Sequence, residues 1–148
     1  MKKTYVPWKT IHQSVRDIAE QVQSEDWKGI VGVARGGLVP AVMLSHRLSI
    51  PTLKTFTATS YKGMDKADLS FDSEFTLDNE GEGWLFVEDI IDSGDTANLI
   101  LDRFPKACLA TVFCKVLNVR RIFHTDRVYY SVDLTVDDWL VFPWECTL

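Results

Sequence analysis

Residues 84–98 read WLFVEDIIDSGDTAN, and this stretch decides the fold. It begins with the apolar run WLFV, which is typical of a buried strand in a parallel sheet. Glu88 and Asp89 close the predicted strand, a polar loop runs from 92 to 96, and an apolar helical pattern follows as far as Phe104. In a strand–loop–helix unit, backbone N–H groups and the helix N-terminus converge on one point, which predicts a phosphate site.

The two carboxylates, Glu88 and Asp89, narrow the choice of ligand for this phosphate site. Carboxylate oxygens suit a sugar diol, and they also suit Mg²⁺, which prefers a few carboxylates together with substrate oxygens and water. The pattern therefore predicts a phosphorylated ligand that carries hydroxyl groups or a magnesium ion. The alternative is an ordinary strand–loop–helix corner with two solvated acids.

The rest of the chain alternates strands with helices, which predicts an α/β fold with a parallel sheet and helices on both faces. The loops after Ala34, Val87 and Cys114 then all fall at the carboxyl ends of strands, where open sheets bind ligands. We expect helices over 10–23, 38–48 and up to 104, strands over 29–34, 51–58, 84–87, 110–117 and 128–134, and a weak hairpin around 71–77.

Composition limits the class of protein. At 148 residues the chain is expected to form one domain, and it has no apolar run of the ~20 residues that a membrane helix needs. The N-terminus has no signal-peptide pattern, and the unpaired spacing of Cys108, Cys114 and Cys146 indicates a reducing compartment. A net charge of −5 argues against nucleic-acid binding. We expect a cytoplasmic protein without a transmembrane segment; peripheral membrane association stays open.

Arg35, Gly36 and Gly37 lie between a predicted strand and helix. Glycine permits close approach of the backbone to an anion, and arginine offers a planar fork of donors. Taken alone, this sequence is as consistent with a structural turn as with an anion site.

Together these motifs resemble the type I phosphoribosyltransferases, most closely the bacterial xanthine-guanine enzymes. The resemblance spans nearly the whole chain and implies the type I fold for a single domain, residues 1–148, with a parallel-sheet core and a small C-terminal base-binding hood. It implies a cis peptide bond before Arg35. The residues implied to bind phosphoribosyl pyrophosphate are Arg35, Gly36, Gly37, Glu88, Asp89, Ile90, Ile91, Asp92, Ser93, Gly94, Asp95 and Thr96.

The C-terminal run from 137 to 145 is rich in aromatic residues and resembles the base-binding hood of that family. The resemblance implies that Trp139 stacks on a purine, that Leu140 contacts its edge through the main chain, and that Lys115 binds the oxygen at purine C6. Packing in the core is the alternative role for these aromatic side chains.

Residues 59–83 correspond by resemblance to a mobile lid that begins with Ser60 and Tyr61. The family's pyrophosphate-binding arginine is replaced here by Ala67, and the neighbouring Lys66 or the earlier Lys62 is expected to supply the charge as a point cation.

The resemblance implies an enzyme that joins xanthine or guanine, with hypoxanthine also open, to phosphoribosyl pyrophosphate, forming a nucleoside 5′-monophosphate and pyrophosphate. Glu88, Asp89 and Asp92 are the expected catalytic residues, with Asp92 facing purine N7 and Asp89 holding Mg²⁺. The family also implies a homo-oligomer, either a dimer or a tetramer. The rival reading is a regulatory module that binds nucleotide on the same fold without catalysis.

Overall fold

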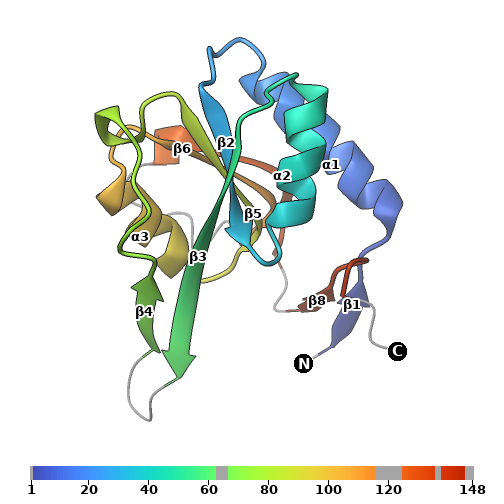
Figure 1. Ribbon diagram of the computed structural model, residues 1–148. Helices are drawn as coiled ribbons and strands as arrows, with labels where there is room; N and C mark the ends of the chain where they lie inside the picture. Colours follow the sequence, from blue (N-terminus) through green and yellow to red (C-terminus); the bar gives the residue numbers. More distant parts are fainter. Residues whose placement is uncertain (1, 63–66, 116–124, 136–137, 146–148) are drawn as a thin grey trace.

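A computed structural model describes residues 2–62, 67–115, 125–135 and 138–145. Its core is a six-stranded sheet in the order β4-β3-β2-β5-β6-β7, in which β3 and β4 are antiparallel and the other neighbours are parallel (Figure 1). The strands are β2 (Gly29–Ala34), β3 (Leu53–Lys62), β4 (Ala67–Phe71), β5 (Trp84–Ile91), β6 (Cys108–Cys114) and β7 (Val128–Asp133).

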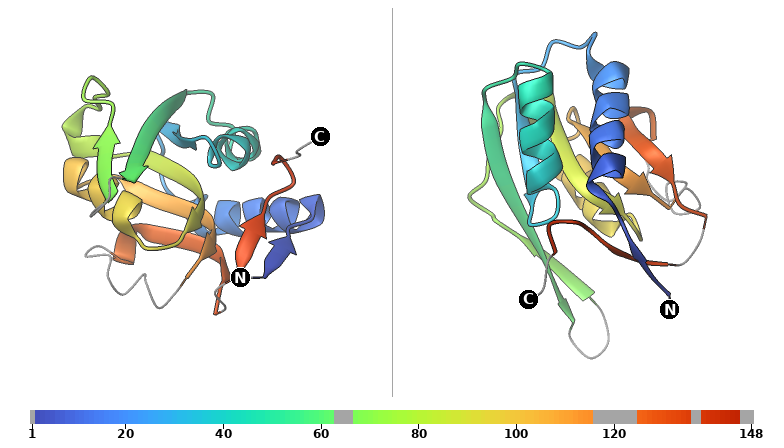
Figure 2. Two further views of the ribbon diagram at one scale, coloured as in Figure 1. Left: turned by 90° about the horizontal axis from the view of Figure 1, so that it is seen from below. Right: turned by 90° about the vertical axis from the view of Figure 1, so that its right-hand side faces the viewer.

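Helices cover both faces of the sheet, as the alternating pattern predicted. Helices α1 (Trp8–Val22) and α2 (Leu38–Arg47) lie on one face and α3 (Asp95–Arg103) on the other (Figures 1 and 2). Short 3₁₀ turns occur at η1 (Asn79–Gly81) and η2 (Thr125–Arg127). Among the described residues, no helix combines the length and apolarity needed to cross a membrane.

Strand β5 shows how the sequence builds the two cores. Leu85 and Val87 are fully buried against the α1 and α2 side, while Trp84 and Phe86 belong to the core on the α3 side. This alternation follows from the two-residue period of a strand. The apolar stripe of α1 is likewise buried, which confirms the helical spacing seen in the sequence.

The predicted boundaries need two corrections. Strand β5 continues to Ile91, so Glu88 and Asp89 lie within it and do not close it, because its ladder with β6 extends to the pair Ile91↔Cys114. The hairpin expected around 71–77 was also misplaced: β3 runs on to Lys62 and pairs with β4. Residues 72–75 instead form a turn that packs on the α3 core, where the aromatic ring of Phe75 meets those of other core residues.

A second, two-stranded sheet was not predicted. Strand β1 (Lys3–Tyr5) pairs in parallel with β8 (Trp139–Val141), so the two ends of the chain lie side by side (Figure 2). A hydrogen bond from the Thr4 hydroxyl to the Asp138 carboxylate, 2.7 Å long, adds a side-chain contact between them. We call β1, β8 and residues 142–145 the hood.

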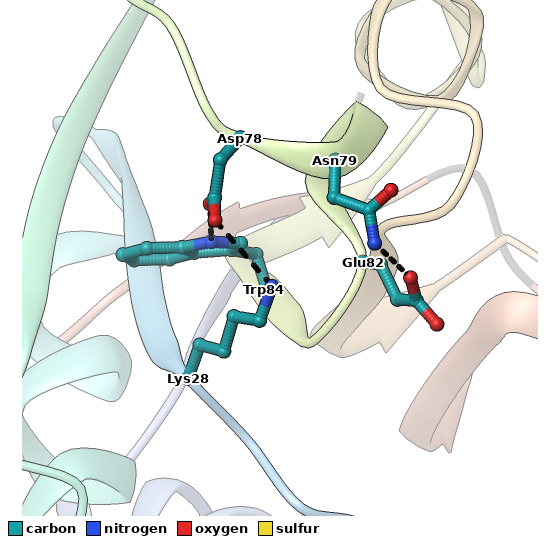
Figure 3. A network of polar contacts seen from close by, with 5 residues as sticks. All are labelled: Lys28, Asp78, Asn79, Glu82 and Trp84. Carbon is teal, nitrogen blue, oxygen red and sulfur yellow. Dashed lines mark hydrogen bonds and ion pairs between the residues drawn. The ribbon is translucent and has the colours of Figure 1, made fainter.

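The amino-terminal end of the central sheet is closed by a polar network around η1 (Figure 3). Asp78 accepts a hydrogen bond from the Trp84 indole N–H at 3.4 Å and forms an ion pair with Lys28 at 3.5 Å, while Asn79 donates to Glu82. Because these residues precede β2 and β5 or begin them, the network lies at the edge opposite the loops that follow these strands.

Candidate active site

Three loops meet at the carboxyl edge of the central sheet, where the alternation of strands and helices placed them. They follow β2, β5 and β6, which are neighbours in the sheet. Parallel strands bring their carboxyl ends to one edge, so residues some 80 positions apart in the sequence share one site.

The loop after β2 contains a cis peptide bond between Ala34 and Arg35, as the resemblance implied. The next two residues lie tightly against β5. A Cβ atom at Gly36 would lie 1.9 Å from a carboxylate oxygen of Asp89, and one at Gly37 would lie 2.1 Å from the carbonyl oxygen of Val87. Both positions therefore exclude any side chain, and the close approach sets Arg35 beside the acids of β5.

The acid pair of β5 lies in a weakly solvated environment. Glu88 is only 7% exposed. Its burial, with a further contribution from the negative charge of Asp89, raises the pKa of Glu88 to about 8. Burial also raises the pKa of Asp89, an effect opposed by a 2.9 Å hydrogen bond from the Ile90 N–H and reinforced by the charge of Glu145.

The loop after β5 leads directly into α3. Gly94 caps the helix with a left-handed φ of 89°, which a residue with a side chain rarely adopts. The Ser93 hydroxyl donates to the Asp95 carboxylate at 2.8 Å and accepts from the Asp95 N–H at 3.3 Å. Asp95 and Thr96 form the first turn of α3, so the predicted loop ends two residues earlier than expected, and the N-terminus of α3 forms its far wall.

Lys115, at the end of β6, forms an ion pair with Asp92 in which the ammonium nitrogen lies 2.7 Å from a carboxylate oxygen. The lysine side chain is largely shielded, whereas that of Asp92 is mostly exposed. A backbone hydrogen bond from the Lys115 N–H to the Ile91 carbonyl, 3.0 Å long, fixes the two loops relative to each other.

The hood stands over this edge and encloses an open cavity of about 1170 Å³. Of the residues predicted for the site, Arg35, Gly36, Asp89 and Trp139 line its wall. The cavity is also lined by residues that sequence reasoning did not assign, namely Lys3, Tyr5, Val6, Val141, Phe142, Pro143, Trp144 and Glu145. Glu88, Gly37, Asp92–Thr96 and Lys115 lie outside that wall, along the same edge of the sheet.

Trp139 and Leu140 have opposite orientations in β8. The Trp139 side chain is 58% exposed and lines the cavity, whereas the Leu140 side chain is buried. The Trp139 N–H donates to the Lys2 carbonyl, and the Val141 carbonyl accepts from the Val6 N–H. Because backbone groups alternate along a strand, the N–H and C=O of Leu140 point to the edge away from β1.

The contribution of β1 is the main site feature that sequence reasoning missed. Lys3 and Tyr5 share the cavity face, and the alternating exposure of β1 is a signal too short to distinguish from an extended terminus. Glu145 closed the aromatic C-terminal run in the sequence, yet its charge is felt at Asp89 only because the hood folds back over β5.

For the predicted lid, the structure describes only the backbone of Ser60 and Tyr61, which pair with Leu69 and Asp68 across the β3–β4 ladder. Lys66 lies outside the described residues.

A magnesium ion would find a partial ligand set here. Within residues 2–62, 67–115, 125–135 and 138–145, no three acidic, histidine or cysteine side chains gather as a metal site. Asp89 faces the cavity while one of its oxygens accepts from the Ile90 N–H. One carboxylate completed by substrate oxygens and water is an arrangement that Mg²⁺ commonly uses, so Asp89 fits the ion without further protein ligands.

Comparison with known proteins agrees with this geometry. The phosphoribosyl transferase domain matches residues 2–148. A xanthine-guanine phosphoribosyltransferase of Idiomarina loihiensis is 34% identical, covering 99% of this chain and 89% of that protein. A protein of the same name from Chromohalobacter salexigens is 32% identical, covering 95% and 82%. The crystal structure of a purine phosphoribosyltransferase from Pyrococcus horikoshii superposes with a TM-score of 0.79 at 27% identity, covering 100% of this chain and 97% of that one. The chain therefore belongs to the phosphoribosyl transferase family.

Proposed function

We propose that this protein is a purine phosphoribosyltransferase of the xanthine-guanine type. In the reaction, N9 of a 6-oxopurine bonds to C1′ of phosphoribosyl pyrophosphate. The bond from C1′ to the pyrophosphate oxygen breaks, and its electron pair leaves with pyrophosphate. The purine loses a proton, and the products are a nucleoside 5′-monophosphate and pyrophosphate.

The ion pair between Asp92 and Lys115 carries this proposal. A 6-oxopurine presents an N–H at N7 directly beside the oxygen at C6. A carboxylate and an ammonium group 2.7 Å apart match that pair, with Asp92 accepting the proton of N7 and Lys115 donating to O6. Adenine places a donor at C6 and would leave the Lys115 ammonium group facing another donor, so the pair favours 6-oxopurines.

The hood supports the same assignment from the other side of the base. The exposed indole of Trp139 in the cavity offers a flat surface for a purine ring. The Leu140 backbone groups, directed away from β1, are placed to contact the edge of the ring near C2. Since a main-chain N–H and C=O can serve an oxygen or an amine there, this contact leaves xanthine, guanine and hypoxanthine unranked.

The remaining residues suit the sugar and its phosphates. The N-terminus of α3, from Ser93 to Thr96, would bind the 5′-phosphate through backbone N–H groups. Glu88 and Asp89 would hold the ribose hydroxyls. Arg35 and the adjoining glycine amides would bind pyrophosphate and stabilise its charge as it leaves.

Magnesium enters the proposal through Asp89. When bound, Mg²⁺ neutralises charge on the pyrophosphate oxygens. The protein would contribute the carboxylate of Asp89, held by the Ile90 N–H, and Arg35 beside it across the cavity wall. A cytoplasmic location and a dimeric or tetrameric assembly stay predictions.

Pyrophosphate release measured with phosphoribosyl pyrophosphate, Mg²⁺ and a panel of bases tests the proposal. We expect turnover with at least one of xanthine, guanine and hypoxanthine, and none above background with adenine or uracil. Turnover with adenine alone would refute the assignment of Asp92 and Lys115. Nucleotide binding without release of pyrophosphate from any base would instead favour a regulatory module.

A further inference from the structure

Strands β3 and β4 form an arm that extends past the carboxyl edge of the sheet. The pairing of β3 with β2 ends at Ala34↔Thr57, immediately before Arg35. Beyond that pair, residues 58–62 of β3 pair with residues 67–71 of β4, and we call these two segments the arm. Figure 1 shows the arm continuing past the end of β2, so it flanks the loop that contains Arg35.

The base of this arm is held by one side chain of α3. Arg103 donates from one guanidinium nitrogen to the Asp72 carbonyl at 2.8 Å. Its second terminal nitrogen donates to the Ser73 carbonyl at 3.2 Å and to the Phe75 carbonyl. The turn that follows the arm therefore directs three carbonyl groups at one guanidinium.

Aromatic contacts strengthen this attachment. The Arg103 guanidinium carbon lies 4.4 Å from the centre of the Phe71 ring, which is itself stacked on Phe56 at 6.3 Å. The last residue of the arm is thus held between the cation and the aromatic core on the α3 side. Phe75, at the other end of the turn, packs edge-on against Phe56 and Phe104.

The position of Arg103 in α3 gives the attachment a functional meaning. Gly94 and Asp95 form the phosphate loop at the N-terminus of this helix, and Arg103 is its last residue. A nine-residue helix is a rigid rod of roughly 14 Å. One short rigid element therefore connects the phosphate loop to the base of the arm.

We propose that Arg103 is a positioning residue for the phosphoribosyl transfer. It fixes the arm relative to the phosphate loop, so that the arm flanks the Arg35 loop while phosphoribosyl pyrophosphate is bound. This inference rests on the proposed function. The planar fork is required because three carbonyls converge on it; a lysine ammonium group keeps the charge but cannot reproduce that geometry or the stacking on Phe71.

The test compares Arg103→Lys and Arg103→Met with Arg127→Met. Arg127 is a matched control, because its guanidinium also donates to two loop carbonyls, those of Pro105 and Ala107, yet it makes no printed contact with the arm. Two properties are measured for each variant: backbone hydrogen exchange by mass spectrometry, and KM for phosphoribosyl pyrophosphate and for the base.

We expect both Arg103 variants to exchange faster over residues 67–75 than the wild type, with no change over 29–34. We also expect KM for phosphoribosyl pyrophosphate to rise on the order of tenfold while KM for the base changes less than about twofold. Arg127→Met should change neither property of the arm or of phosphoribosyl pyrophosphate binding.

Three results would overturn the inference: unchanged exchange over 67–75, faster exchange with an unchanged KM, or equal effects in Arg127→Met. Full retention of both properties in Arg103→Lys would show that charge alone suffices and would remove the fork from its role. Absence of transfer to every base in the wild type would instead overturn the proposed function, and the exchange measurement would still report on the attachment of the arm.

Discussion

Replacement of Glu88 by glutamine should change how the stability of the fold depends on pH. Glu88 is buried in β5, and its pKa rises from 4.5 to about 8 in the folded protein, first because of burial and then because of the charge of Asp89. Between these two values the folded state holds a proton that the unfolded state has released. The unfolding free energy must therefore fall as the pH rises through this window.

The size of this effect follows from the gap between the two pKa values. One pKa unit corresponds to about 1.4 kcal/mol, so the full gap is worth about 5 kcal/mol. Both ends of the range from about pH 5.5 to about pH 7.5 lie inside the window. Over that range ionisation of Glu88 should lower the unfolding free energy by about 2–3 kcal/mol. Glutamine has no such proton, so Glu88→Gln should lose that much less.

Urea unfolding at several pH values, at one fixed protein concentration, measures this difference. The unfolding free energy of the wild type should decline relative to that of Glu88→Gln as the pH rises. Glu20→Gln, a change at an exposed acid of α1, provides the control and should follow the wild type. If the curves of the wild type and Glu88→Gln stay parallel from pH 5.5 to 7.5, the buried proton assigned to Glu88 does not exist.

Further predictions concern the glycine loop, the acid that faces the base, and the metal. Gly37→Ala should destabilise the fold by at least about 1–3 kcal/mol in urea unfolding, because the new methyl group would meet the Val87 carbonyl oxygen of β5. Gly36→Ala should retain most of its stability but lose activity, since it displaces the side chain of Asp89; equal activity would show that this carboxylate can move freely. Asp92→Asn should depress kcat by about 10²-fold or more, with little change in the binding of phosphoribosyl pyrophosphate measured by calorimetry. Removal of Mg²⁺ by a chelator should abolish pyrophosphate release, and excess Mg²⁺ should restore it; release that persists in the chelator would contradict the role given to Asp89.

Much of the fold could be predicted because its signals are local. The apolar run from 84 to 87 alternates between two cores, and the spacing of Ile11, Ile18 and Val22 buries one stripe of α1. Each pattern depends on the period of a strand or a helix, which a sequence displays directly. The end of β5 was misjudged because the acids at 88 and 89 resemble a strand end, whereas the ladder with β6 satisfies their backbone groups.

The candidate site divides in the same way. The sequence by itself determined the phosphate loop from 92 to 96, because a helix N-terminus after a tight loop is an anion site wherever it occurs. It also determined that Arg35 and the acids of β5 would share one edge, since parallel strands end together.

Only the tertiary structure decided what stands around those loops. The sheet formed by β1 and β8 brings Lys3 and Glu145 to one cavity, and α3 carries Arg103 to the base of the arm. These contacts join segments that no local period relates. They arise because burial of the hood and of the aromatic core leaves few arrangements of the chain, and that choice is made by packing over the whole molecule.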